Sequence, residues 1–421
     1  MKLKKTLLLS MVCSMFLYGN SDIFTLNVDN TTEGSSYIET SSSLEGIIDK
    51  IDLDTISSNI TYNETNALSA NLDFRGLPVT LNFSENSKAV VFSVPSLGIT
   101  ETFSGSTRDD SLDLLVDWFK VNGKDTVERI MKKLAEVSPV DPIAGNPNSL
   151  MATTVESDFD KGFMNVARKQ KELKTKKTGG TTKVSKSNRI VLGPSYKSLD
   201  IDGKRSQNYT LPLGYSFVDN EDSLRSFNIS LPLSYTDVEG ATSYGLGLGI
   251  SYSTPVKPQW VLTPGIKYSM VGSADLGSLA QMGSLSLSST YSIPLENNHM
   301  LSIGNMIGYY STLKLYDGDY AYDPGIQNTV FRNALMYSLP TENIAKDSSL
   351  DLYVIDTQYT GSKLYLTSYD EFGFSFGYRK LNVNVLSDKS EYAYERELKM
   401  GLSYLTSSKA KGLKVNFGFV F

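Results

Sequence analysis

The chain has 421 residues, of which 40% are hydrophobic and 20% charged, and a formal net charge of -6. That length allows about two to three domains, and the composition is not that of a disordered chain. The mild acidity argues against a nucleic-acid partner, which usually requires a strongly basic domain. No run approaches the roughly 18 consecutive apolar residues of a membrane-spanning helix, so the sequence excludes a helical membrane protein.

Residues 1–21 have the pattern of a secretory signal peptide. Lysines precede an apolar run over residues 7–17, and Gly19 and Ser21 supply small residues for cleavage near residue 21. The only cysteine, Cys13, lies inside this segment; a lipoprotein anchor there is the alternative, disfavoured by the bulky residues before it. The mature chain would therefore have no disulfide and no thiolate metal site.

The next two regions differ in their hydrophobic period. Residues 22–108 are predicted to be a β-rich exported region, because apolar and polar residues alternate over 68–74 and 79–83, with one short helix around 44–51. Residues 109–148 change to a helical period and are predicted to hold a helical pair over 111–138, with Asp110 and Asp125 as caps.

Residues 149–188 are predicted to form a helix and a basic linker. Val155, Phe159, Phe163 and Val166 recur at helical spacing, and the helix is expected to span 149–177. It ends in a lysine-rich segment, after which glycines 179 and 180 terminate it. This segment is the one helix placed directly before the C-terminal strands.

Residues 189–421 are predicted to form an antiparallel up-and-down transmembrane β-barrel. Apolar residues alternate with small or polar ones in runs of about nine, which matches a tilted strand crossing the hydrocarbon layer. Such runs indicate about twelve strands, with ten or fourteen as alternatives because Pro194, Asn333 and Asp356 interrupt the apolar face. The runs centre near Leu192, Leu213, Leu231, Leu248, Leu262, Leu287, Ile303, Leu335, Leu352, Phe374, Met400 and Phe417.

Tyrosines recur late in the predicted strands. Because neighbouring strands run in opposite directions, these residues would fall alternately at the two membrane surfaces and form two aromatic girdles. The alternative is a set of core tyrosines in a soluble β-sandwich, which the export signal and the polar alternate face disfavour. The predicted girdle contains Tyr215, Tyr235, Tyr252, Tyr268, Tyr291, Tyr309, Tyr337, Tyr378 and Tyr404.

The last strand resembles the C-terminal insertion signal of bacterial outer-membrane proteins. Leu413, Val415, Phe417, Phe419 and Phe421 alternate with other residues up to the last one. In that family the terminal Phe and the alternating aromatics before it are read by the barrel-assembly machinery. The resemblance implies the same partner here, and a location in the outer membrane.

The layout of residues 149–421 is similar to that of an autotransporter. In that family an exported region is followed by a helix that threads the pore and by a twelve-stranded barrel at the C-terminus. The region before the helix is short here and lacks the repeated rungs of a long β-helix. The resemblance therefore concerns the architecture alone.

Small residues at positions expected to face the lumen support a helix inside the barrel. A wall without large side chains leaves room for a helix, although small residues can also relieve strand curvature. The basic end of the helix would then meet inward carboxylates such as Asp351 or Glu397. The predicted wall contains Gly245, Gly247, Gly249, Gly283, Ser286, Gly373 and Gly377.

The sequence gives no sign of catalysis, a metal or a cofactor. His299 is the only histidine, and it falls in a predicted turn where a solvated side chain is expected. We therefore expect no enzyme, with the lipid bilayer and the assembly machinery as partners.

Three functions fit this sequence. The first is an autotransporter-like translocator or anchor that displays or holds its own N-terminal region. The second is a porin-like solute channel with a periplasmic N-terminal plug or partner-binding module. The third is a structural or adhesive surface protein. If both barrel ends lie in the periplasm, the long loops should be 271–281, 312–328 and 358–370, all outside.

Overall fold

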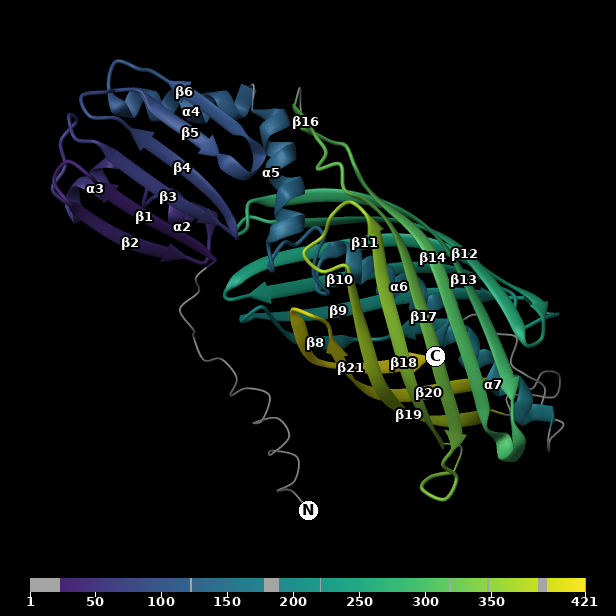
Figure 1. Ribbon diagram of the computed structural model, residues 1–421. Helices are drawn as coiled ribbons and strands as arrows, with labels where there is room; N and C mark the ends of the chain where they lie inside the picture. The colour runs from purple at the N-terminus through teal and green to yellow at the C-terminus, as the bar shows by residue number, and fades with distance from the viewer. Residues whose placement is uncertain are drawn as a thin grey trace.

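A computed structural model describes residues 23–121, 123–177, 189–219, 221–317, 320–346, 348–384 and 392–420. It has two parts, an N-terminal domain and a barrel (Figure 1). The predicted signal peptide, the glycines at 179 and 180, and Phe421 lie outside the described residues. No helix within the described ranges is long and apolar enough to cross a membrane.

The N-terminal domain is built on a six-stranded antiparallel sheet in the order β2-β1-β3-β4-β5-β6. Alternating residues of β1 are buried, which explains why this strand lies inside the sheet and not at its edge. The strands are β1 (Phe24–Asn30), β2 (Ser35–Ser41), β3 (Leu68–Phe74), β4 (Leu77–Phe83), β5 (Val90–Val94) and β6 (Ile99–Phe103), with a 3-10 turn η1 at Pro95–Leu97.

Four helices pack beside this sheet. The helix predicted around 44–51 is present as α2 (Leu44–Ile48), and a second short helix that was not predicted, α3 (Leu53–Asn59), follows it with Asp52 as its cap. The expected pair is present as α4 (Arg108–Val121) and α5 (Lys124–Val137). Helix α5 leads directly from the domain toward the barrel (Figure 1).

The C-terminal part is a closed barrel of twelve antiparallel strands, as the sequence predicted. The first strand is interrupted at Gly193–Pro194, which divides it into β7 (Arg189–Leu192) and β8 (Ser195–Ile201). Strand β21 (Ala410–Val420) pairs with both pieces and closes the barrel. The others are β9 (Lys204–Val218), β10 (Ser226–Val238), β11 (Ala241–Lys257), β12 (Trp260–Ser273), β13 (Ser278–Pro294), β14 (Met300–Leu313), β17 (Gln327–Pro340), β18 (Ser348–Gly361), β19 (Ser368–Asn384) and β20 (Tyr392–Thr406).

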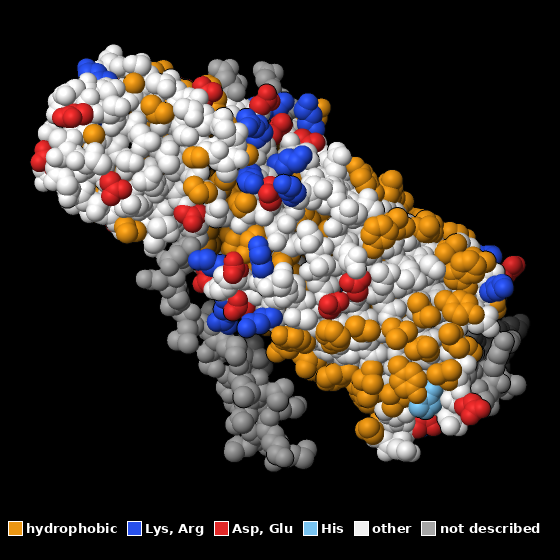
Figure 2. All heavy atoms as spheres, viewed as in Figure 1, with side chains coloured by type: hydrophobic (Ala, Val, Ile, Leu, Met, Phe, Trp, Pro, Cys, Tyr) orange, Lys and Arg blue, Asp and Glu red, His pale blue; other side chains and the backbone are white. Residues whose placement is uncertain are grey.

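The outer surface of the barrel is hydrophobic, as lipid contact requires. Along β11, Leu246, Leu248 and Ile250 are exposed, whereas the alternate residues face the lumen. Figure 2 shows that hydrophobic side chains gather on the part of the barrel farther from the N-terminal domain. The barrel wall near that domain is mostly polar, so the strands extend beyond the hydrophobic belt on that side.

The N-terminal domain and the barrel's C-terminal residues lie at opposite ends of the barrel. The turns at 201–204 and 238–241 and the loop at 273–278 lie at the end next to the domain, where Leu44 N–H donates to the Asp275 carbonyl at 2.7 Å. Strand β21 runs away from this end. Helices α6 (Leu150–Gly162) and α7 (Met164–Lys177) run through the lumen between the two ends (Figure 1).

Loop lengths do not distinguish the two ends of the barrel, contrary to the expectation from the sequence. Only the loop 313–327, which carries the hairpin of β15 (Leu315–Asp317) and β16 (Tyr320–Tyr322), is long on the domain side. The segments 273–278 and 361–368 are no longer than turns at the other end, such as 340–348. The sequence overestimated these loops because their flanking residues extend the strands.

A row of prolines and glycines crosses the first four barrel strands. Pro212 pairs with Pro232 between β9 and β10, and the register of β10 on β11 is interrupted where Pro232 faces Gly247. The break at Gly193–Pro194 continues the row into the first strand. Because proline has no backbone N–H, this wall has fewer ladder hydrogen bonds than its neighbours.

Candidate functional site: the plugged lumen

The chain enters the barrel through a buried loop, residues 138–149. Every described residue from Val140 to Ser149 is buried, although this segment has no regular secondary structure. Side chains satisfy its backbone: Asp141 accepts from the N–H groups of Ile143 and Ala144 at 3.1 and 3.0 Å. Such a loop is tolerated away from water only because its polar groups are paired.

The loop is also tied to the barrel wall. Asn148 donates to the Ser206 hydroxyl at 2.7 Å, and Lys197 donates to the carbonyl of Pro147 at 2.9 Å. Ser149 then caps α6, its hydroxyl accepting from the N–H of Ala152. The start of the lumen helix is thus fixed by contacts from two strands.

Helix α6 lies against one wall of the barrel, formed by β12, β13 and β14. Gly162 approaches Ser288 so closely that a Cβ at this position would clash with the serine side chain. The carbonyl of Gly162 accepts a hydrogen bond from Thr290 at 2.6 Å. Phe163 packs over Gly304, which has no side chain to obstruct the ring. Small residues therefore do make room for the helix, but mainly at Gly162 and Gly304.

The helix predicted over 149–177 is divided in two at Phe163. This residue has φ −109° and ψ −67°, and its N–H still donates to the carbonyl of Phe159 at 2.7 Å. The bend keeps α7 inside the lumen, where Lys169 donates to Ser226 at 2.9 Å and Ser292 donates to Gln170 at 2.6 Å.

Acidic residues of α6 pair with lysines of the barrel wall. Asp158 lies 2.5 Å from the Lys267 ammonium, with the two side chains 8% and 1% exposed. Ser284 and Tyr310 donate to the same carboxylate at 3.2 and 3.1 Å. Lys267 reaches this position by lying over Gly249, where a side chain would obstruct it.

A second acidic residue of α6 bridges the strands at the closure of the barrel. Glu156 pairs with Lys197 of β8 at 3.0 Å and with Lys414 of β21. These strands are hydrogen-bonded to each other, with Lys197 and Lys414 in register. Glu156 therefore lies between two neighbouring buried cations and offsets the repulsion between them.

A third ion pair lies within the wall and contacts the helix through an aromatic ring. Arg332 of β17 pairs with Glu371 of β19 at 2.6 Å and donates to Thr357 at 2.7 Å. Its guanidinium lies 5.3 Å from the ring centroid of Phe159 on α6. Helix α6, which we call the plug, is thus held by ion pairs, hydrogen bonds and aromatic packing at neighbouring positions of one helix segment.

These pairs involve α6, whereas the sequence-based prediction concerned the basic end of the helix. Asp351, expected to meet the basic end of the helix, pairs with Lys399 of the barrel at 2.7 Å. The Glu397 side chain and those of residues 171–177 lie outside the described residues. In the three described ion pairs between α6 and the wall, the helix supplies the carboxylate and the strand supplies the lysine.

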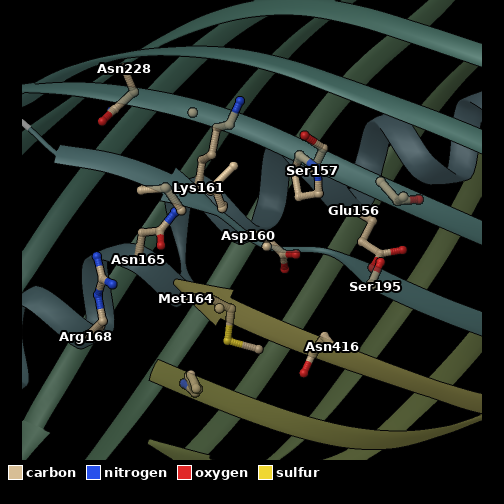
Figure 3. Close-up of a pocket in the computed structure, with 18 of the residues that line it drawn as sticks. Glu156, Ser157, Asp160, Lys161, Met164, Asn165, Arg168, Ser195, Asn228 and Asn416 are labelled. Carbon is tan, nitrogen blue, oxygen red and sulfur yellow. The ribbon is translucent and has the colours of Figure 1, made fainter. Parts of the chain in front are cut away.

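A cavity of about 220 Å³ remains on the other side of the helices, next to the seam between β21 and the first strand. Figure 3 shows Glu156 and Asp160 of α6 and Asn165 of α7 beside Ser195 and Asn416 of the wall. Its lining is mixed in charge, so it can hold water and small ions.

The sequence-predicted residues occupy these positions. Leu413 and Phe417 are exposed on the outer face, and Val415 and Phe419 are half-buried on the same face. The predicted girdle tyrosines face outward, with Tyr235 and Tyr337 half-buried and the others exposed. Tyr196, Tyr209 and Tyr244, which were not predicted, join Tyr235 in one row of ring contacts.

The predicted small-residue wall is reassigned at one position. Gly245, Gly247 and Gly249 face the lumen, as do Ser286, Gly373 and Gly377. Gly283 faces outward instead, because it pairs with the exposed Tyr268 and shares a face with Leu285. His299 was expected to be solvated but bonds the Tyr337 hydroxyl at 2.6 Å.

A buried ion pair joins the N-terminal domain to the lumen loop. Arg75 lies in the tight turn between β3 and β4, with φ 57°, and pairs with Asp141 at 3.6 Å, both side chains being fully buried. Arg75 also donates to Ser278 of β13 at 3.1 Å. One guanidinium therefore connects the domain, the loop and the barrel.

Burial raises the pKa of the Asp141 carboxyl, while Arg75 and the N–H groups of Ala144 and Ile143 act in the opposite direction. A carboxyl whose pKa is higher in the folded chain than in the unfolded chain opposes folding once it is ionised. The ionised carboxylate therefore destabilises this junction at neutral pH, and that cost falls as the pH is lowered toward the unfolded-state pKa.

Replacing Arg75 with Met should lower the free energy of opening of this junction by about 3–5 kcal/mol at neutral pH, because it leaves a buried carboxylate without its cation. The loss should be smaller near pH 4, roughly the pKa of an unperturbed carboxyl, where Asp141 takes up a proton. Proteinase K digestion of the purified protein across this pH range tests the prediction. The rate of cleavage between residues 138 and 149 reports how often the junction opens.

The double variant Arg75→Met/Asp141→Asn is the control for this prediction. It removes both charges and should recover part of the resistance to protease. Equal cleavage of wild type and Arg75→Met at neutral pH would show that the ion pair does not hold the junction.

No family model matches the chain, and no curated relative matches it. Among solved structures, it is similar to the beta domain of the Bordetella autotransporter BrkA, at 13% identity over 56% of this chain and 98% of that one, with a TM-score of 0.41. The translocator domain of the autotransporter NalP from Neisseria meningitidis matches at 10% identity over 64% and 97%, with a TM-score of 0.39.

A porin gives a comparable match. The KdgM porin in complex with disordered oligogalacturonate matches at 11% identity over 55% of this chain and 99% of that one, with a TM-score of 0.33. At these values the likeness concerns the fold alone. The closed barrel of antiparallel strands, its hydrophobic outer surface and the helices in its lumen are the features of a membrane-spanning β-barrel.

Proposed function

We propose that this protein is an autotransporter-like anchor that holds its own N-terminal domain, residues 23–137, at the cell surface. The observation that carries the proposal is the plug: α6 lies in the lumen, and its carboxylates pair with lysines from both sides of the barrel. A helix held in this way connects the domain to the membrane anchor through the barrel, and it fills the space that a wide solute pore would need.

The arrangement of the ends supports a surface location. Barrels of this class keep the ends of the barrel segment in the periplasm. Strand β21 runs away from the N-terminal domain, and the domain packs on the opposite end through Ala135 and Gly145, whose carbonyls accept from the N–H groups of Tyr365 and Leu366 at 2.8 and 3.0 Å. With β21 ending in the periplasm, the domain would lie outside.

Cysteine labelling on intact cells tests this orientation. The mature chain is expected to lack cysteine, so single substitutions give unambiguous labels. Glu64→Cys lies on an exposed loop of the N-terminal domain, and Glu342→Cys lies on an exposed turn at the other end of the barrel. A membrane-impermeant maleimide should label Glu64→Cys on intact cells and Glu342→Cys only after the outer membrane is permeabilised.

The two variants control for each other, because each must react fully once the outer membrane is opened. The reverse pattern would place the domain in the periplasm and refute the anchor. Labelling of both on intact cells would indicate a damaged membrane, which cytoplasmic and periplasmic marker proteins in the same sample reveal.

A solute channel is the second candidate, and the cavity beside the helices favours it. In this interpretation the helices narrow the passage without closing it. Its mixed lining, which includes Asp160, Lys161 and Glu371, would pass small hydrated ions and not large solutes. The adhesive surface protein remains compatible with the anchor, since a displayed domain can bind a partner.

We propose that residues 1–21 are removed as a signal peptide, that the barrel-assembly machinery reads Phe417, Phe419 and Phe421, and that the protein is not an enzyme. The alternation of exposed Leu413 and Phe417 on the outer face of β21 supports the second of these.

A further inference from the structure

A row of polar side chains crosses the lipid-facing surface of the barrel. Ser289 of β13, Asn305 of β14, Asn333 of β17 and Asp356 of β18 are in register with one another and face outward. Asn305 and Asn333 are exposed, and they interrupt strands whose other outward residues are mostly apolar. Contact with lipid chains alone does not explain why polar side chains occupy these outward positions.

The asparagine pair lies at the middle of the hydrophobic belt. Between β14 and β17 the outward pairs are, in order, Leu301–Tyr337, Ile303–Leu335, Asn305–Asn333, Ile307–Phe331 and Tyr309–Thr329. A tyrosine therefore stands at each end of the series, at the level where aromatic rings meet headgroups. The two amides are equally far from both tyrosines, so they lie at the depth of the lipid chains.

Hydrogen bonds along the row satisfy these amides only in part. Asn305 donates to the Asn333 carbonyl oxygen at 2.8 Å, and Asn333 donates to Asp356 at 3.4 Å. Each amide has two N–H groups and one acceptor oxygen. Among the described residues, one N–H on each amide and the oxygen of Asn305 have no partner, and hydrocarbon cannot supply one.

The other side of the barrel is different. From Phe227 to Tyr235 and from Tyr244 to Tyr252, the outward residues of β10 and β11 are apolar or tyrosine, including Ile229, Leu231, Leu248 and Ile250. The outer surface of β10 and β11 is therefore suited to contact with lipid alone. The polar row is therefore a property of one face, formed by β13, β14, β17 and β18.

We propose that this face contacts a second copy of the chain, with Asn305 and Asn333 at the centre of the interface. Copies inserted in the same orientation can be related by a two-fold axis along the membrane normal, which brings the same residues together at the same depth. An amide offers both donors and an acceptor, so a second amide pair satisfies the groups that the first leaves open. Polar side chains join membrane segments in this way.

Cysteine cross-linking in outer membranes tests the interface. Asn305→Cys is the test variant, and Ile250→Cys, exposed on the apolar wall, is the matched control. After mild oxidation, Asn305→Cys should give a dimer-sized band on non-reducing gels, and Ile250→Cys should give none. Asn333→Cys repeats the test at the neighbouring position, and heat-dependent mobility on gels shows that each variant is folded.

The amide contribution is tested separately in the full-length protein. Asn305→Leu/Asn333→Leu should shift the purified protein from dimer to monomer in gel filtration with light scattering, whereas Ile250→Asn should leave the dimer unchanged. No cross-link at either asparagine, or equal cross-links at Asn305→Cys and Ile250→Cys, would overturn the proposal. A cross-linked product of another size would identify a different protein and would also overturn it.

Discussion

Removing residues 23–177 is expected to open the barrel to ions, whereas removing only residues 23–137 is expected to leave it closed. The two variants differ by the lumen loop and helices α6 and α7, so they separate the plug from the N-terminal domain. Barrels larger than about eight strands leave space that side chains of the wall alone do not fill. Without the helices, the lysines and carboxylates of the wall would face water in a continuous lumen.

Planar-bilayer recordings measure this effect. The variant without residues 23–177 should give stable single-channel steps, and the wild type and the variant without 23–137 should not. Steps of equal size in all three proteins would show that ions pass beside the helices, through the cavity next to Asp160 and Lys161. That result would favour the channel over the anchor and would leave the cysteine-labelling experiment to decide the side of the domain.

Replacing Lys267 with Met is expected to destabilise the barrel by about 3–5 kcal/mol, because it leaves the buried Asp158 carboxylate without its cation. Methionine fills much of the same space, so the loss reports the charge and not a cavity. Denaturant unfolding in detergent, followed by the fluorescence of Trp260 on the same strand, measures the change in the free energy of unfolding.

Two controls define the source of the loss. Lys267→Met/Asp158→Asn removes both charges and should recover part of the stability. Lys120→Met breaks a pair with Asp117 whose side chains are 67% and 69% exposed, and should cost less than about 0.5 kcal/mol. If Lys267→Met is as stable as the wild type, charge does not hold the plug in place.

The barrel could be predicted from the sequence because its signal is repeated. Each strand carries its own alternation, and a strand such as β19, with Phe372 and Phe374 outward and Gly373 between them, needs no information from the rest of the chain. Even the interruptions at Pro194 and Asn333 did not hide their strands, since residues on either side of each kept the period of two.

Whether a single small residue faces the lumen or the outside of the barrel could not be predicted as reliably. Gly283 precedes a run of serines in β13, where both faces carry small side chains, and only Leu285 and Leu287 fix the outward face. The same limit applies to helix caps. Thr107, and not Asp110, precedes α4 and caps it: the Thr107 hydroxyl accepts the N–H of Asp110 at 3.1 Å, and the Asp110 carboxylate accepts the N–H of Thr107 at 3.0 Å.

The ion pairs between α6 and the barrel wall could not be predicted from the sequence. The lysine-rich end of the helix suggested cations on the helix and carboxylates on the wall. The observed pairs, Glu156 with Lys414 and Asp158 with Lys267, depend on the rotation and depth of the helix relative to distant strands. No local pattern encodes these quantities, because residues that meet here are separated by more than a hundred positions in the chain.

The proline and glycine row lies close to the seam of the barrel, and the plug is seated on the opposite wall. Pro194, Pro212 and Pro232 have no N–H to donate, so the sheet has fewer hydrogen bonds between strands near the seam where β21 joins β7 and β8. Helix α6 rests on β12–β14, where the registers of β12 with β13 and of β13 with β14 are continuous. Helix α6 can thus pack on β12–β14 while the sheet is still open at the seam, and the barrel can close around the helix afterwards. The N-terminal domain then need not pass through a closed barrel.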